Sequence, residues 1–100
     1  MNKPVIVGYS RSPFTLAKKG ELINVRPEDL LSEVIKNLVI KSKINPEDIE
    51  DIIAGCAFPE GEQGFNIGKI VTFMTGMNVK TAGMTVNRWC GSSMQSIHIG

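Results

Sequence analysis

Apolar side chains recur at helical spacing along the stretch that begins at Pro27. They fall three or four residues apart, with charged residues between them: Leu30, Leu31, Val34, Ile35, Leu38 and Val39. This period is typical of a helix that buries one face. Pro27 suits the first turn of a helix, and Glu28 and Asp29 complement the positive end of its dipole. The pattern therefore predicts an amphipathic helix that starts at Pro27.

Three short apolar runs predict strands. The first covers residues 5–9 and leads into a turn at residues 10–13. The second covers residues 52–57, and the third covers residues 84–86 and continues directly into the segment around Cys90. Short apolar runs bounded by turn-forming residues are typical of buried strands.

Two asparagines mark further helix starts. Asn45 precedes Pro46 and can cap a helix, but only about one turn fits before the second strand. Asn66 can cap a longer helix that carries Ile67, Ile70, Val71 and Met74, and Gly76 supplies the left-handed residue that ends it. The preceding loop, "GEQGFNIG", lacks the Lys and Ser/Thr of a phosphate-binding loop. We expect a plain turn there, followed by the capped helix.

The predicted order is strand, helix, strand, helix, strand, helix. Such alternation indicates an α/β fold, here βαβαβα, with neighbouring parallel strands and right-handed crossovers. No internal repeat or linker divides residues 1–100, so we expect one piece of one domain. The last helix reaches Gly100 without a closing turn, and we expect the chain to stop inside that helix. Such a piece would leave one sheet face and one edge uncovered and would tend to self-associate.

Composition excludes several classes of protein. The chain has 100 residues, 42% hydrophobic content and a formal net charge of +1, which favours neither nucleic acid nor a membrane surface as a partner. Its N-terminal apolar run is too short for a signal peptide or a membrane span, so we expect a cytoplasmic protein. Two cysteines are too few for a disulfide scaffold and should remain thiols. No spacing of Asp, Glu, His or Cys predicts a metal site.

Cys90 is the candidate nucleophile. In "TVNRWCGSSMQ" it stands where a strand passes into a helix, and Gly91 permits a tight turn. A sulfur at a helix N-terminus meets the positive end of the dipole and unpaired N–H groups, which can also stabilise an oxyanion. The arrangement resembles a nucleophile elbow with Cys in place of Ser. Because free cysteines are often buried, a packing role for Cys90 stays open, and Cys56 within "IIAGCAF" is interpreted as core.

The only histidine does not supply a base for Cys90. On a helix that starts at Gly91, His98 lies about 12 Å further along the axis than Cys90, beyond the reach of a hydrogen bond. We expect His98 on the surface of that helix or at an interface.

The segment "TVNRWCGSSMQSIH" resembles the nucleophile segment of thiolases, in which a Val-Asn-(Arg/Lys)-x-Cys-Gly-Ser run carries the acyl-accepting cysteine. The resemblance extends along the chain. "VIVGYSRSPF" is similar to the family's opening strand and Arg-Thr-Pro-Phe turn, and "INPEDIEDIIAGCAFPEGEQGFNIGK" is similar to its second strand and Gly-Gln-Gly-x-Asn loop. Gly76 and Met77 resemble the helix end before the third strand.

The resemblance implies the thiolase fold, two α/β halves in αβαβα layers, usually in a homodimer or homotetramer. Residues 1–100 would form the N-terminal part of its N-terminal domain. By similarity, Cys90 would attack the 3-keto carbon of a 3-ketoacyl-CoA and release acetyl-CoA, and free coenzyme A, the co-substrate, would then remove the acyl group. The Cys90 N–H would form half of an oxyanion hole. No permanently bound cofactor is implied.

Family members complete the site with two histidines and a second cysteine from later segments. None of these is present here, so the isolated chain is predicted to lack thiolase activity. The flanks of Cys90 favour the degradative 3-ketoacyl-CoA thiolases of fatty-acid oxidation over the biosynthetic acetoacetyl-CoA thiolases. Membership of a fatty-acid oxidation complex is a further expectation. Trp89 departs from the smaller apolar residue expected there and would pack beneath the elbow or narrow the acyl pocket.

Two alternatives stay open. A ketosynthase of the same superfamily shares the fold, but the Val-Asn-Arg lead-in and the Ser-Pro-Phe turn favour a thiolase. The chain would otherwise be a thiolase-like structural or interaction module without catalysis.

Overall fold

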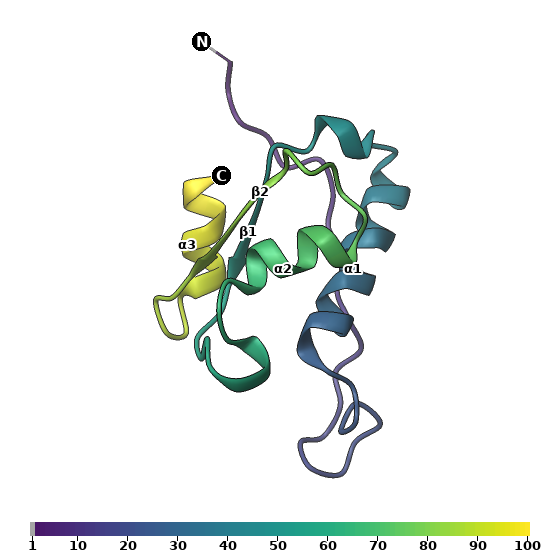
Figure 1. The fold of residues 1–100 in the computed structure, drawn as a ribbon, viewed down its shortest axis with the longest axis vertical. Coiled ribbons are helices and arrows are strands. Elements are labelled where there is room, and N and C mark those ends of the chain that lie inside the picture. The colour runs from purple at the N-terminus through teal and green to yellow at the C-terminus, as the bar shows by residue number, and fades with distance from the viewer. Residues whose placement is uncertain (1) are drawn as a thin grey trace.

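A computed structural model describes residues 2–100 of the chain. Its elements follow in the order α1 (Pro27–Ser42), the 3-10 turn η1 (Pro46–Asp48), β1 (Asp51–Gly55), the 3-10 turn η2 (Gly61–Gln63), α2 (Ile67–Met74), β2 (Ala82–Val86) and α3 (Ser92–Ile99). Figure 1 shows α2 and α3 on opposite sides of the two strands, with α1 beyond α2. No helix in residues 2–100 is long and apolar enough to cross a membrane.

β1 and β2 form a parallel pair, with Asp51 opposite Ala82 and Gly55 opposite Val86. Because side chains alternate between the two faces of a strand, Ile52 and Ala54 point to the same side, and both pack against the core beside α2. The parallel pairing and the α/β class are as predicted. The prediction of an uncovered sheet face was wrong, because α3 covers the second face and no face is left open along its whole length. Neither outer edge of the sheet is paired within residues 2–100.

Two glycines bring α2 directly onto β2. A β-carbon on Gly68 would collide with the backbone of Met84, and a β-carbon on Gly83 would lie 2.5 Å from the Cα of Lys69. Any side chain at these positions would push the helix away from the strand. The sequence signalled the turn at Gly76, whose φ of +69° ends the helical region as expected, but not these close approaches.

Asn66 caps α2, as predicted, and also fastens it to β2. Its Oδ1 accepts hydrogen bonds from the Lys69 N–H at 3.2 Å and from Thr85 Oγ1 at 2.8 Å. Its Nδ2 donates to the Gly83 carbonyl at 2.8 Å. One side chain therefore satisfies an end of the helix and two groups on the neighbouring strand.

The hydrophobic core lies between α1, α2 and β1. Cys56, Ile67 and Val71 are buried, and four partly buried side chains pack on them: Leu31, Ile35, Ile52 and Ala54. Cys56 is 8% exposed, which confirms its predicted packing role.

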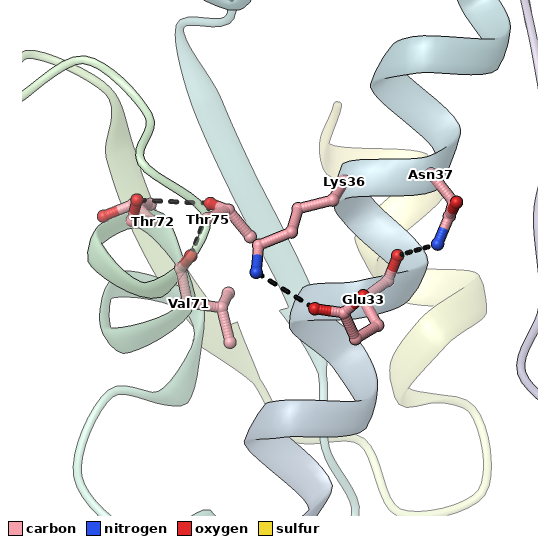
Figure 2. Close-up of polar contacts among 6 residues, drawn as sticks. All are labelled: Glu33, Lys36, Asn37, Val71, Thr72 and Thr75. Atoms are coloured by element: carbon pink, nitrogen blue, oxygen red, sulfur yellow. Dashed lines mark hydrogen bonds and ion pairs between the residues drawn. The ribbon is translucent and has the colours of Figure 1, made fainter.

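Polar side chains near the contact between α1 and α2 bond within their own helix (Figure 2). On α1, Lys36 pairs with Glu33 at 3.0 Å, and Asn37 Nδ2 donates to the Glu33 carbonyl at 2.8 Å. At the C-cap of α2, Thr75 Oγ1 donates to the Val71 carbonyl at 2.6 Å. α1 and α2 are joined through apolar contacts, because Leu31 and Ile35 of α1 pack on the core that includes Ile67 and Val71 of α2.

The first turn of α1 follows the sequence signals, with Pro27 at its start and Glu28 and Asp29 in the turn. The pKa of Glu28 lies below its ordinary value because the carboxylate accepts a hydrogen bond from its own backbone N–H and a second from Arg26. At the other end, Lys43 closes the helix in the left-handed region at φ 55°.

The predicted strand at residues 5–9 was wrong. The segment has no regular structure, and Val5, Ile6 and Val7 are 69–82% exposed. A strand requires a hydrogen-bonded neighbour, and within residues 2–100 the only ladder joins β1 to β2. Residues 8–9 instead lie against the end of α1, where the Lys41 Nζ stands 4.8 Å above the Tyr9 ring. The order is therefore αβαβα in place of the expected βαβαβα.

Candidate functional site

Cys90 lies in the turn between β2 and α3, and Gly91 is the N-cap of α3. The position between a strand and a helix agrees with the sequence analysis. Cys90 is exposed, whereas Cys56 is buried, so a core-packing role holds for Cys56 alone. Of the two thiols, Cys90 is therefore the one open to solvent.

Ser92 and Asn87 hold the turn around Cys90. The Asn87 Oδ1 accepts from the Trp89 N–H at 3.0 Å, which is an Asx turn. Ser92 Oγ accepts from the Arg88 N–H at 2.9 Å and donates to the Trp89 carbonyl at 2.6 Å. Two backbone bonds complete the turn: Gly91 N–H to Arg88 O at 3.0 Å and Ser92 N–H to Trp89 O at 3.2 Å.

Trp89 adopts the left-handed region, with φ of +48°. For a bulky residue this conformation costs about 1–3 kcal/mol and persists only where surrounding contacts impose it. The hydrogen bonds from Asn87 and Ser92 are those contacts. The residue just before the thiol is thus held in a conformation that the chain alone does not favour.

The Cys90 backbone N–H has no hydrogen-bond partner within residues 2–100, whereas the N–H groups of Gly91 and Ser92 are used inside the turn. An unpaired N–H at the start of a helix can donate to an oxyanion. The turn therefore supplies one thiol and one free donor on the same residue.

The carboxyl ends of both strands meet at this turn. A β-carbon on Gly55 would collide with the backbone of Ser92 and Ser93, so the N-terminus of α3 lies against the end of β1. The Cys56 N–H donates to the Val86 carbonyl at 2.9 Å. The carboxyl edge of parallel strands is a common place for ligand sites in α/β proteins.

Of the two alternatives expected for Trp89, packing beneath the turn was wrong, and narrowing of an acyl pocket stays a prediction. Its side chain is 65% exposed and meets Phe58 edge to face, with ring centroids 5.6 Å apart. The buried side chain of this turn is instead Ser92, which is 4% exposed, and the backbone of Ser92 lies directly against Gly55. Trp89 and Phe58 therefore join the loop after β2 to the loop after β1.

The remaining candidates lie apart from the thiol. His98 is exposed in the last turn of α3, as expected, so it gives Cys90 no base. The glycine-rich loop forms the plain turn η2 ahead of the capped helix, also as expected. No group of three or more His, Cys, Asp or Glu side chains in the described residues could hold a metal ion.

A hollow of about 420 Å³ opens between α1 and the end of β1, where its lining includes Arg11, Leu31, Cys56 and Gln63. Cys90 is not among the residues that line it. The hollow and the exposed thiol are therefore separate features of this chain.

The roles of Asn87, Ser92 and Phe58 in this turn were not predicted from the sequence. An Asn two residues before a turn residue is a known Asx-turn signal, and a Ser in the first turn of a helix often bonds to nearby backbone. The first signal could have identified Asn87, and the second could have identified Ser92. The contact between Phe58 and Trp89 joins two loops and had no local signal.

The sequence of this chain is similar to a family model and to curated proteins that agree with one another. The family model described as "Thiolase, N-terminal domain" matches residues 4–100. The chain is 43% identical over 99 residues to a 3-ketoacyl-CoA thiolase of Colwellia psychrerythraea and 42% identical to one of Photobacterium profundum. Each alignment covers 98% of this chain and 26% of the relative, so the chain spans about a quarter of the length of these curated relatives.

A solved structure gives the same result for the fold. An acetyl-CoA acetyltransferase from Syntrophomonas wolfei superposes with a TM-score of 0.83 at 27% identity, over 95% of this chain and 23% of that one. The likeness extends over nearly all the elements described above.

Proposed function

Because this chain belongs to the thiolase family, we propose that Cys90 is the nucleophile of an acyl-CoA acyltransferase and carries the acyl group as a thioester. The observation that carries the proposal is the exposed Cys90 in the strand-to-helix turn, with its own N–H unpaired among the described residues. That N–H would form half of an oxyanion hole for the tetrahedral intermediate.

The proposed reaction is thiolytic cleavage of a 3-ketoacyl-CoA. The Cys90 thiolate bonds to the 3-keto carbon, the bond between C2 and C3 breaks, and the departing acetyl-CoA carbanion takes up a proton. Coenzyme A then attacks the thioester, which releases the shortened acyl-CoA and restores the thiol. The reverse sequence condenses two acyl-CoA molecules.

A degradative 3-ketoacyl-CoA thiolase is the favoured subtype. Relatives with that name are 43% and 42% identical to this chain, and the "NRWCGSSMQ" flanks support the same choice. The acetoacetyl-CoA-forming subtype is the alternative, and the acetyl-CoA acetyltransferase of similar structure supports it. Comparing turnover of long-chain 3-ketoacyl-CoA with that of acetoacetyl-CoA distinguishes the two.

Residues 1–100 would be the first part of the N-terminal domain of the acting enzyme. The chain matches only 26% of its relatives' length, and it contains one histidine, remote from Cys90. Two histidines and a second reactive cysteine would come from outside it, within a homodimer or homotetramer, with a fatty-acid oxidation complex as a further assembly.

The test is mass spectrometry of the full-length gene product after mixing with a 3-ketoacyl-CoA or acetyl-CoA. We expect acyl mass on the peptide that contains Cys90, loss of that mass in Cys90→Ala, and retention in the matched variant Cys56→Ala, because Cys56 is buried. Acylation elsewhere in protein that still binds substrate would overturn the proposal.

A steady-state assay of acetoacetyl-CoA thiolysis tests the chain of 100 residues by itself. We expect no thiolysis of acetoacetyl-CoA, because the described residues offer Cys90 neither a base nor a proton donor. Measurable turnover by the purified chain would contradict the requirement for residues outside it.

A non-catalytic interaction module is the second candidate. It is favoured by the many large apolar side chains that stay exposed, among them Val5, Phe65 and Ile97. Absence of any acyl-cysteine in the full-length product would give this candidate the lead.

A further inference from the structure

The turn before α3 contains a strained residue directly beside the exposed thiol. Trp89 holds φ at +48°, while Cys90 follows it and stays exposed. Strained backbone persists where neighbouring groups impose it and is concentrated at functional sites.

Ser92 makes the larger share of the restraint. Its Oγ accepts from the Arg88 N–H at 2.9 Å and donates to the Trp89 carbonyl at 2.6 Å, so one hydroxyl bridges both sides of Trp89. Ser92 is only 4% exposed, which shields these bonds from water. It also begins α3, so the helix and the turn share an anchor.

Asn87 restrains Trp89 from the strand side. Its Oδ1 accepts from the Trp89 N–H at 3.0 Å, while the Trp89 carbonyl is held by Ser92. Both backbone groups of Trp89 are thus engaged, and the Cys90 N–H that follows is left unpaired within residues 2–100. The direction of that N–H depends on the peptide plane between Trp89 and Cys90, which the two side chains fix.

We propose that Ser92 and Asn87 are positioning residues: by clamping Trp89 in the left-handed conformation, they orient the thiol and the free N–H of Cys90 for attack on an acyl carbonyl. This inference rests on the proposed function of Cys90 and adds residues that act through it. A misplacement of about 1 Å at a reacting group can lower a rate by about a hundredfold, so such a clamp affects the rate more than substrate binding.

Trp89 is the single tryptophan of residues 1–100, so its fluorescence reports on the clamp in full-length gene product in which any tryptophan outside residues 1–100 has been replaced by Phe. Loss of the Ser92 hydroxyl should loosen the indole, so the fast depolarisation of Trp89 fluorescence should rise at least about twofold in Ser92→Ala. The matched control is Ser96→Ala. Ser96 is a buried serine on the same helix whose Oγ donates to the Ser92 carbonyl at 3.1 Å, away from Trp89, and its variant should leave the signal unchanged.

The second readout is single-turnover acylation of Cys90 by acetyl-CoA in the full-length gene product. In Ser92→Ala the maximal rate should fall about 10- to 100-fold while the half-saturating concentration changes less than about twofold. Ser96→Ala should keep the wild-type rate within about twofold. Substitution of the buried Ser92 can disturb folding, so variants of the exposed Asn87 provide a second series. Acylation of Cys90 should be slow in Asn87→Ala, and Asn87→Ser, which keeps a weaker acceptor, should recover part of the rate.

The Trp89 signal and the acylation rate together separate the possible outcomes. An unchanged Trp89 signal in both Ser92→Ala and Asn87→Ala would show that no clamp exists. A loosened Trp89 with wild-type acylation would show that the clamp does not position Cys90, and equal losses in Ser92→Ala and Ser96→Ala would reduce the effect to helix stability. Absence of acyl-Cys90 in the wild type would instead reject the proposed function. In that case the positioning role fails with it, whatever the Trp89 signal shows.

Discussion

Single residues decide how closely the elements of this fold approach one another. Gly55 is the clearest case, because the backbone of Ser92 and Ser93 occupies the space where its β-carbon would be. This contact sets the N-terminus of α3, and with it the turn of Cys90, against the end of β1. In the sequence, Gly55 is one of ten glycines, with no sign that another helix comes so close.

Gly55→Ala should lower the free energy of unfolding by about 2–3 kcal/mol, because the added methyl group must displace rigid backbone. Gly76→Ala is the matched control: its φ is +69° but its surroundings are open, so the change should cost only about 1 kcal/mol. Urea denaturation of both variants measures the difference. Equal costs would mean that α3 does not pack on Gly55 as described.

At the scale of elements, α2 and β2 depend on a side chain that belongs to neither. Asn66 precedes α2, caps it, and bonds to Gly83 and Thr85 of β2. Its capping role was predictable, since Asn before an apolar helical period is a local signal. Its partners on the strand were not, since they lie 17 and 19 residues further along the chain.

Asn66→Ala should therefore cost more than loss of an ordinary cap. Removing a capping side chain costs about 1 kcal/mol, and two further hydrogen bonds would add about 1 kcal/mol each. Asn45→Ala serves as the control, because Asn45 only caps η1 through the Glu47 N–H. Thermal or urea unfolding should show Asn66→Ala as the more damaging change by about 1–2 kcal/mol; an equal loss would contradict the bridge to β2.

α1 could be predicted from its own residues, whereas the structure of residues 5–9 could not. A helix satisfies its hydrogen bonds within its own segment, so the apolar period and the first-turn residues sufficed to locate α1. A strand depends on a neighbour at a distant place in the chain. Residues 5–9 have the composition of a strand, yet no ladder within residues 2–100 includes them.

At the scale of the whole molecule, the described chain buries little of its apolar content. Among residues 2–100 the buried apolar side chains are Cys56, Ile67, Val71 and Val86. Many larger ones are exposed, including Met94 and Ile97 on α3, at 61% and 64%. Exposed apolar surface on this scale is typical of faces that contact other protein.

We expect the 100-residue chain to self-associate at micromolar concentration, as sedimentation velocity would show. Ile97→Lys should weaken the association because it places a charge on the exposed face of α3. His98→Lys is the control, since His98 is an exposed polar neighbour and its replacement should change little. A stable monomer at all concentrations would contradict this prediction and favour a self-sufficient small domain.

Local features of this protein could be predicted from the sequence: where α1 and α2 begin, the short turn after Asn45, the packing role of Cys56, and a cysteine between a strand and a helix. These depend on neighbours a few residues apart, which a pattern can display. Packing between distant segments was needed to settle that residues 5–9 stay unpaired, that Trp89 lies exposed against Phe58, and that Ser92 is buried. Those outcomes depend on which segments compete for the same space, and that competition is settled only when distant parts of the chain meet.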